Sequence, residues 1–305
     1  MNVKYKEAAS YNPAVADACE IALVRLMLAF SSHKHLLRLV GGLVPRYLTP
    51  TNLPKVPAHI GTTDVDVVLN VEVLLKDGEN YSSLREQLRA AGFSRLMRNG
   101  HPSSWQWVCH VGAYDIVVEF LQHTDGEDAG RLASLAHEDV SACRIQHIGI
   151  VEDWFEAKDV TLTLEDGIRT ETIRYADVVS FVVLKALAFD SRAERKDAAD
   201  LDHVLRYAGE LEATADQFAA RMREGKHQTA VQDALAALVK NFCTDQAGEG
   251  HRKSGPGASA AFRGFDRKEN EDAFARECRD VSGRVTELLR LLESRVLQSI
   301  LPKES

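Results

Sequence analysis

The chain is poor in cysteine, with five in 305 residues, an odd number. No two of them form a CxxC pair. This scarcity argues against a disulfide framework and against a zinc site built on cysteine. We expect the five thiols to be reduced, as in a cytoplasmic protein.

The segment IALVRLMLAF, residues 21–30, is too short and too interrupted to cross a membrane. Arg25 breaks it, and Asp17 and Glu20 precede it. A membrane span needs about 20 predominantly apolar residues, and a signal peptide begins with basic rather than acidic residues. We therefore expect a soluble protein without a membrane partner.

Positive charge is in deficit, with 37 Lys and Arg against 45 Asp and Glu and a formal net charge of −8. This balance disfavours a surface that binds nucleic acid throughout, although a local basic strip would not register in the total. The hydrophobic content of 45% is ample for a packed core, and the length allows one large domain or two.

Asp64, Val65 and Asp66 begin a run of valine and leucine that predicts a β-strand over residues 64–73. Side chains alternate along a strand, so Asp64 and Asp66 project from the same face. Such pairs are hard-oxygen ligands for Mg²⁺, which keeps part of its water shell and bridges to phosphates. The alternative is a solvated strand face without a metal.

Gly41 and Gly42 end a short apolar run and precede a segment that can form a helix. A glycine pair lets the backbone approach a ligand closely and presents N–H groups to an anion. The alternative is a tight turn without a ligand. Together with the paired carboxylates, the glycines indicate nucleotide chemistry.

These motifs occur in the order of a known family. Gly41-Gly42, the stretch Thr62-x-Asp64-Val65-Asp66 and the lone Asp115 in AYDIVVEFL resemble the nucleotidyltransferase superfamily of DNA polymerase β and the tRNA CCA-adding enzymes. Further along, FVVLKALAFDSRAERKDAADLDHVL, residues 181–205, resembles a helix pair of the AbiEii-like branch. That branch includes toxins of toxin–antitoxin and phage-defence systems. The resemblance covers roughly Leu37 to Leu205.

The resemblance implies that Asp64, Asp66 and Asp115 bind two Mg²⁺ ions, which hold an NTP. It also implies that Gly41 and Gly42 surround the β- and γ-phosphates of that NTP. The superfamily often has a serine after the first glycine, and here Gly42 takes its place.

Three neighbouring residues leave alternatives open. Thr62 matches a threonine common in this branch, or it only shapes the entry to the strand. Asp115 is otherwise an ordinary aspartate at the start of a strand. Glu119 lies four residues later on the same strand face and is an alternative metal ligand.

Lys185 lies within an apolar stripe of a predicted helix, and a lysine there must either extend to the surface or point at an anion. We expect it to contact the triphosphate. Lys196, Asp197 and Asp200 begin the next predicted helix. They form either a solvated helix start or, as the resemblance favours, a group that orients Lys185 or binds phosphate.

The hydrophobic periodicity, read with the resemblance, predicts an α+β fold, with a small mixed β-sheet nucleotidyltransferase core, flanking helices and a helical C-terminal region. We place the core and its N-terminal helix at residues 1–174 and the helical region at residues 175–305. Residues 244–268 are rich in Gly, Ala and Ser with several cations, and they predict a mobile loop. Further strands are predicted at 105–111, 113–121, about 143–151, 159–164 and 168–174, the last two forming a hairpin around Asp166-Gly167.

We therefore expect an enzyme that transfers a nucleotide from an NTP to an acceptor hydroxyl and releases pyrophosphate. The resemblance allows a tRNA 3′ end as the acceptor and, as the role, a toxin restrained by a cognate antitoxin. A second hypothesis gives the same fold a small-molecule or protein acceptor; the acidic net charge favours it and the cations of residues 251–267 oppose it. A third is a non-catalytic nucleotide-binding sensor.

Overall fold

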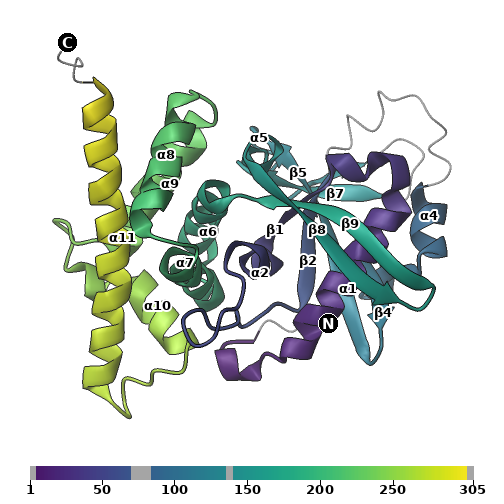
Figure 1. The fold of residues 1–305 in the computed structure, drawn as a ribbon, viewed down its shortest axis with the longest axis horizontal. Helices are drawn as coiled ribbons and strands as arrows, with labels where there is room; N and C mark the ends of the chain where they lie inside the picture. The colour runs from purple at the N-terminus through teal and green to yellow at the C-terminus, as the bar shows by residue number, and fades with distance from the viewer. Residues whose placement is uncertain (1–4, 70–83, 135–139, 301–305) are drawn as a thin grey trace. The chain divides into compact units, whose positions relative to one another are not determined.

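The computed structural model describes residues 5–69, 84–134 and 140–300 (Figure 1). They form two compact units. The sheet unit comprises residues 11–47 and the described part of 60–177, and the helical unit comprises residues 5–10, 48–59 and 178–300. None of the helices in these ranges is long and apolar enough to cross a membrane.

The sheet unit begins with helix α1 and contains all the described strands. Its helical segments are α1 (Pro13–Phe30), η2 (Ser31–Leu36), η3 (Gly41–Leu43), α2 (Pro45–Leu48), α4 (Leu84–Ala90) and α5 (Ile150–Asp153). Its strands are β1 (Arg38–Val40), β2 (Asp64–Val68), β3 (Phe93–Arg98), β4 (His101–Val111), β5 (Tyr114–Thr124), β6 (Leu132–Ser134), β7 (Ser141–Gln146), β8 (Phe155–Leu164) and β9 (Gly167–Ala176). The predicted strand at 64–73 is confirmed as β2, and its last four residues lie outside the described ranges.

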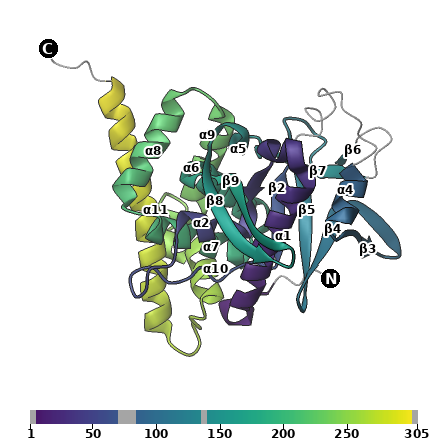
Figure 2. The same cartoon turned by 45° about the vertical axis from the view of Figure 1, so that its right-hand side comes forward.

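The strands form one mixed sheet in the order β3-β4-β5-β2-β1-β9-β8, and β7 joins it through β5 with β6 at its side. β1 runs antiparallel to β2, whereas β2 runs parallel to β5. β8 and β9 form the predicted hairpin, which Figure 2 shows as a long curved ribbon beside α1. The predicted α+β class with a mixed sheet and a helical C-terminal region is confirmed.

Helix α1 packs on one face of the sheet. Phe30 at its end contacts Phe120 of β5, with ring centroids 5.7 Å apart. Val65 and Val67 of β2 are fully buried on the strand face opposite to that of the two aspartates. Burial of this apolar face against α1 fixes which side of β2 the aspartates occupy, because a shift of one residue would exchange the two faces.

The helical unit consists of η1 (Ala8–Ser10), α6 (Val178–Arg192), α7 (Arg195–Tyr207), α8 (Leu211–Arg223), α9 (Gln228–Phe242), η5 (Gly250–Arg252), α10 (Ser254–Phe262) and α11 (Glu271–Ile300). α7 packs against α6 and α10, and the long α11 packs against α8 and α10 (Figure 1). This arrangement surrounds α7 with helices, which explains why several of its charged residues are buried.

The predicted mobile loop at residues 244–268 is wrong, because η5 and α10 occupy much of it. Gly255, Ala260 and Phe262 are buried. A Cβ on Gly255 would lie 2.4 Å from the Phe242 ring, so the small residues allow close helix packing instead of mobility. Composition alone does not distinguish these two uses of glycine and alanine.

We expect Gly255→Ala to lower the free energy of unfolding by about 1–3 kcal/mol, because the added methyl group overpacks the contact with Phe242. Gly257 in the same helix is the control, since its Cβ would meet its nearest neighbour, Phe274, at 3.9 Å. Gly257→Ala should be neutral or stabilising by about 0.4–1 kcal/mol. Urea unfolding of the two variants checks the difference, and equal stabilities would show that α10 is not packed as described.

Candidate active site

Asp64 and Asp66 lie on the central strand β2 and project from one face of the sheet, as predicted. Both side chains are half-buried. In the register of the sheet, Asp66 is opposite Val40 of β1 and Glu119 of β5. Adjacent strands are about 4.8 Å apart, so the backbone positions of Asp66 and Glu119 are neighbours on one face of the sheet.

Gly41 makes room for the Asp66 carboxylate. A Cβ at position 41 would lie 2.0 Å from Asp66 Oδ2, and the backbone of Gly41 has φ of +74°. Both facts require glycine, because other residues carry the Cβ and rarely adopt positive φ. Gly42 follows, buried in η3. The predicted phosphate contact of Gly41 and Gly42 stays a prediction, and the close approach to Asp66 is a role of Gly41 that the sequence did not reveal.

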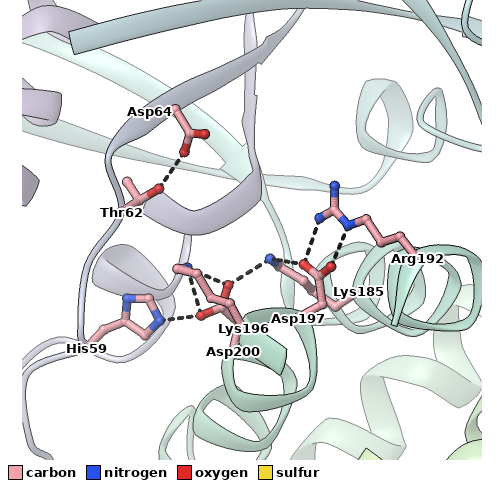
Figure 3. Close-up of polar contacts among 8 residues, drawn as sticks. All are labelled: His59, Thr62, Asp64, Lys185, Arg192, Lys196, Asp197 and Asp200. Atoms are coloured by element: carbon pink, nitrogen blue, oxygen red, sulfur yellow. Dashed lines mark hydrogen bonds and ion pairs between the residues drawn. The ribbon is translucent and has the colours of Figure 1, made fainter. Parts of the chain in front are cut away.

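Thr62 holds the Asp64 side chain. Its hydroxyl donates a hydrogen bond of 2.6 Å to Asp64 Oδ1 (Figure 3). Thr62 is only 3% exposed, so the donor is fixed by its surroundings. Thr62 thus orients one of the two aspartates, and a contact between Thr62 and a bound nucleotide stays a prediction.

Asp115 lies at the start of β5, apart from the register of β2. The pairing of β2 with β5 begins at Val117, two residues later, which is about 7 Å further along the strand. Asp115 is instead opposite His110 of β4 and makes a hydrogen bond with its Nδ1. Their side chains are 70% and 67% exposed. Glu119 is therefore the β5 carboxylate next to Asp66.

The carboxylates of the sheet do not form a closed cage. Within the described ranges, no three His, Cys, Asp or Glu side chains converge enough to hold a metal ion as they stand. Mg²⁺ is usually bound by one or two carboxylates while it keeps several waters. The residue types of Asp64, Asp66 and Glu119, which share one face of the sheet, suit that manner of binding.

Lys185 of α6 is buried in the helical unit between two carboxylates of α7. Its Nζ donates to Asp197 Oδ1 at 2.9 Å and to Asp200 Oδ2 at 2.7 Å. Burial would lower the pKa of Lys185, but the two aspartates outweigh it and raise this pKa. The aspartates thus orient Lys185, one of the roles suggested for them, and the triphosphate contact of Lys185 stays a prediction.

Two further cations complete this network (Figure 3). Arg192 binds Asp197 through two hydrogen bonds, of 2.7 and 2.9 Å. Lys196 donates to Asp200 at 2.8 and 3.0 Å. Burial would raise the pKa of Asp197, yet Lys185 and Arg192 lower it to about 2. Both aspartates are therefore ionised at neutral pH.

His59 is a member of the network that sequence reasoning missed. Its Nε2 lies 2.9 Å from Asp200 Oδ1, and burial lowers its pKa. Nearby, Thr49 Oγ1 lies 3.0 Å from His203 Nε2 of α7. These two contacts fasten the proline-rich segment 48–59 to α7. The histidine followed no helix or strand pattern, so no local signal identified it.

Comparisons with known proteins assign no family to this chain. No protein-family model matches the chain, and no curated protein is similar to it in sequence. Among solved structures, it is similar to an antigenic nucleotidyltransferase-like protein from Paracoccidioides brasiliensis, with 13% sequence identity and a TM-score of 0.34. The match covers 71% of this chain and 87% of that one.

We expect Lys185→Met to lower the free energy of unfolding by about 3 kcal/mol, since it removes the cation shared by two buried carboxylates. Lys196→Met is the control. Its side chain is more exposed, and Asp200 keeps Lys185 and His59 as partners, so we expect a loss of about 1 kcal/mol. Urea unfolding measures both. A Lys185→Met variant as stable as the wild type would contradict a structural role for this lysine.

Proposed function

We propose that the chain is a Mg²⁺-dependent nucleotidyltransferase, which moves a nucleotide from an NTP to an acceptor hydroxyl and releases pyrophosphate. The observation that carries this proposal is the placement of Asp64, Asp66 and Glu119 on one face of two paired strands. Gly41 supports it, because its missing Cβ leaves the space that the Asp66 carboxylate occupies.

In this proposal the carboxylates hold Mg²⁺, which supplies positive charge to the triphosphate and to the leaving pyrophosphate. Asp64 is kept in position by the buried hydroxyl of Thr62. The N–H groups of Gly41 and Gly42 are the donors that we assign to the phosphates. The work of the protein is then to position charged groups before the reaction begins.

For the acceptor, we propose the 3′ end of an RNA such as a tRNA, and for the physiological role a toxin restrained by an antitoxin. A second candidate is a small molecule or a protein side chain. One observation favours this second candidate: several cations of residues 251–267 already pair with nearby acids. These pairs are Arg252 with Glu249, Lys253 with Asp245, Arg263 with Glu277 and Arg267 with Glu271.

The experiment that tests the proposed activity is incubation of the purified protein with Mg²⁺, total cellular RNA and each α-³²P-labelled NTP in turn. The control is Asp64→Asn/Asp66→Asn. We expect wild type alone to transfer label, and the labelled RNA band identifies the base and the acceptor. Label that enters protein or a small molecule instead supports the second candidate. If the protein binds NTP but releases no pyrophosphate under any of these conditions, the proposal is contradicted and the nucleotide-binding sensor is the remaining hypothesis.

The third carboxylate can be assigned by comparing Glu119→Gln with Asp115→Asn in the same assay. The register beside Asp66 supports Glu119, so we expect Glu119→Gln to lower the rate of transfer about 100-fold, as for loss of one preorganised electrostatic group. Asp115→Asn should change the rate little, because Asp115 is exposed and paired with His110. The reverse order would restore Asp115 as the ligand predicted from the sequence.

A further inference from the structure

Glu119 lies where the sheet divides. On one side of β5, the last residue pair with β4 is Glu119 with Gln106. Beyond it, β7 replaces β4, beginning with the pair Leu121 and Cys143. A hydrogen bond between the hydroxyl groups of Ser104 and Ser141 joins β4 to β7 near this division. Gln106, the β4 residue of that last pair, therefore lies directly opposite Glu119.

That residue, Gln106, is buried and holds Glu119 by hydrogen bonding. Its Nε2 donates to Glu119 Oε1 at 2.8 Å. Gln106 is 1% exposed, and its own backbone N–H donates to Ser103 Oγ at 3.1 Å. Its Oε1 is buried and has no hydrogen-bond partner among the described residues. A buried polar residue with one oriented bond and one unsatisfied acceptor requires an explanation.

We propose that Gln106 is a positioning residue, which fixes the Glu119 carboxylate for binding a divalent cation beside Asp66. This inference rests on the proposed function. A neutral amide donor suits the task, because it orients one carboxylate oxygen without supplying a positive charge that would compete with the cation. Thr62 holds Asp64 in the same way, through a buried neutral donor. Partners of metal ligands commonly have this role.

The test is Mn²⁺ binding, measured by water-proton relaxation on the full chain, with Gln106→Met as the variant. Methionine has a similar length and lacks the donor. We expect Mn²⁺ to bind about 10- to 100-fold more weakly than to wild type, the usual cost of losing such a partner. Wild-type affinity in a folded Gln106→Met protein would overturn the inference.

Gln122→Met is the matched control. Gln122 is also a buried glutamine with an unpartnered Oε1 among the described residues. It lies on β5 three positions after Glu119, and strand alternation places it on the opposite face. We expect this variant to bind Mn²⁺ as wild type does. An equal loss of affinity in both variants would mean a general effect of core substitution and would overturn the specific role of Gln106.

A double-mutant cycle with Glu119→Gln shows whether Gln106 acts through Glu119. In the Glu119→Gln background, Gln106→Met should weaken Mn²⁺ binding less than about 2-fold, because the carboxylate that it orients is already gone. Independent, additive losses would overturn the inference.

Failure of the proposed function gives a different result. If Mn²⁺ binding by wild type is absent, or is the same in Asp64→Asn/Asp66→Asn, the metal site itself is refuted and Gln106 has no cation to serve. If binding requires Asp64 and Asp66 but is indifferent to Gln106→Met, only the positioning role is refuted. The two proposals are thereby separated.

Discussion

The parallel pairing of β2 with β5 determines which charged groups of the sheet unit can act together. It sets Asp66 directly beside Glu119 and leaves Asp115 outside the paired region. The pairing is held by hydrophobic burial on the other face, where Val65, Val67 and Phe120 are fully buried. Since a slip of one residue would bring those side chains to the face of the aspartates, the apolar core and the carboxylate positions are specified by one constraint.

Two groups of carboxylates in this chain have hydrogen-bond partners of different kinds. In the sheet unit, Asp64 and Glu119 receive hydrogen bonds from the neutral groups of Thr62 and Gln106, which orient them but leave their charge. In the helical unit, Asp197 and Asp200 are bound by lysine and arginine. Acids that are already paired with cations have little to gain from a metal ion. This pairing is a physical reason not to look for Mg²⁺ at α7.

The sequence was sufficient for the fold class, for the hairpin around Asp166-Gly167 and for the shared face of Asp64 and Asp66, because these follow from local alternation and turn chemistry. It was insufficient where partners are distant in the chain. His59 reaches Asp200 across 141 positions. The contact between Gln106 and Glu119 depends on the exact register of β4 with β5, which the sequence does not specify. α10 was missed because glycine that permits close packing and glycine that permits motion look alike in composition.

The net charge of the network around Lys185 affects whether an anion can bind to the helical unit. It contains three cations, Lys185, Arg192 and Lys196, against two carboxylates, Asp197 and Asp200, so its formal charge is 3 − 2 = +1 with His59 neutral. The surplus favours an anion nearby even though Lys185 itself is engaged. The Lys185 side chain is 9% exposed and that of Arg192 is 48% exposed. Because the Arg192 side chain is the more exposed of the two, an approaching anion would meet Arg192 before Lys185.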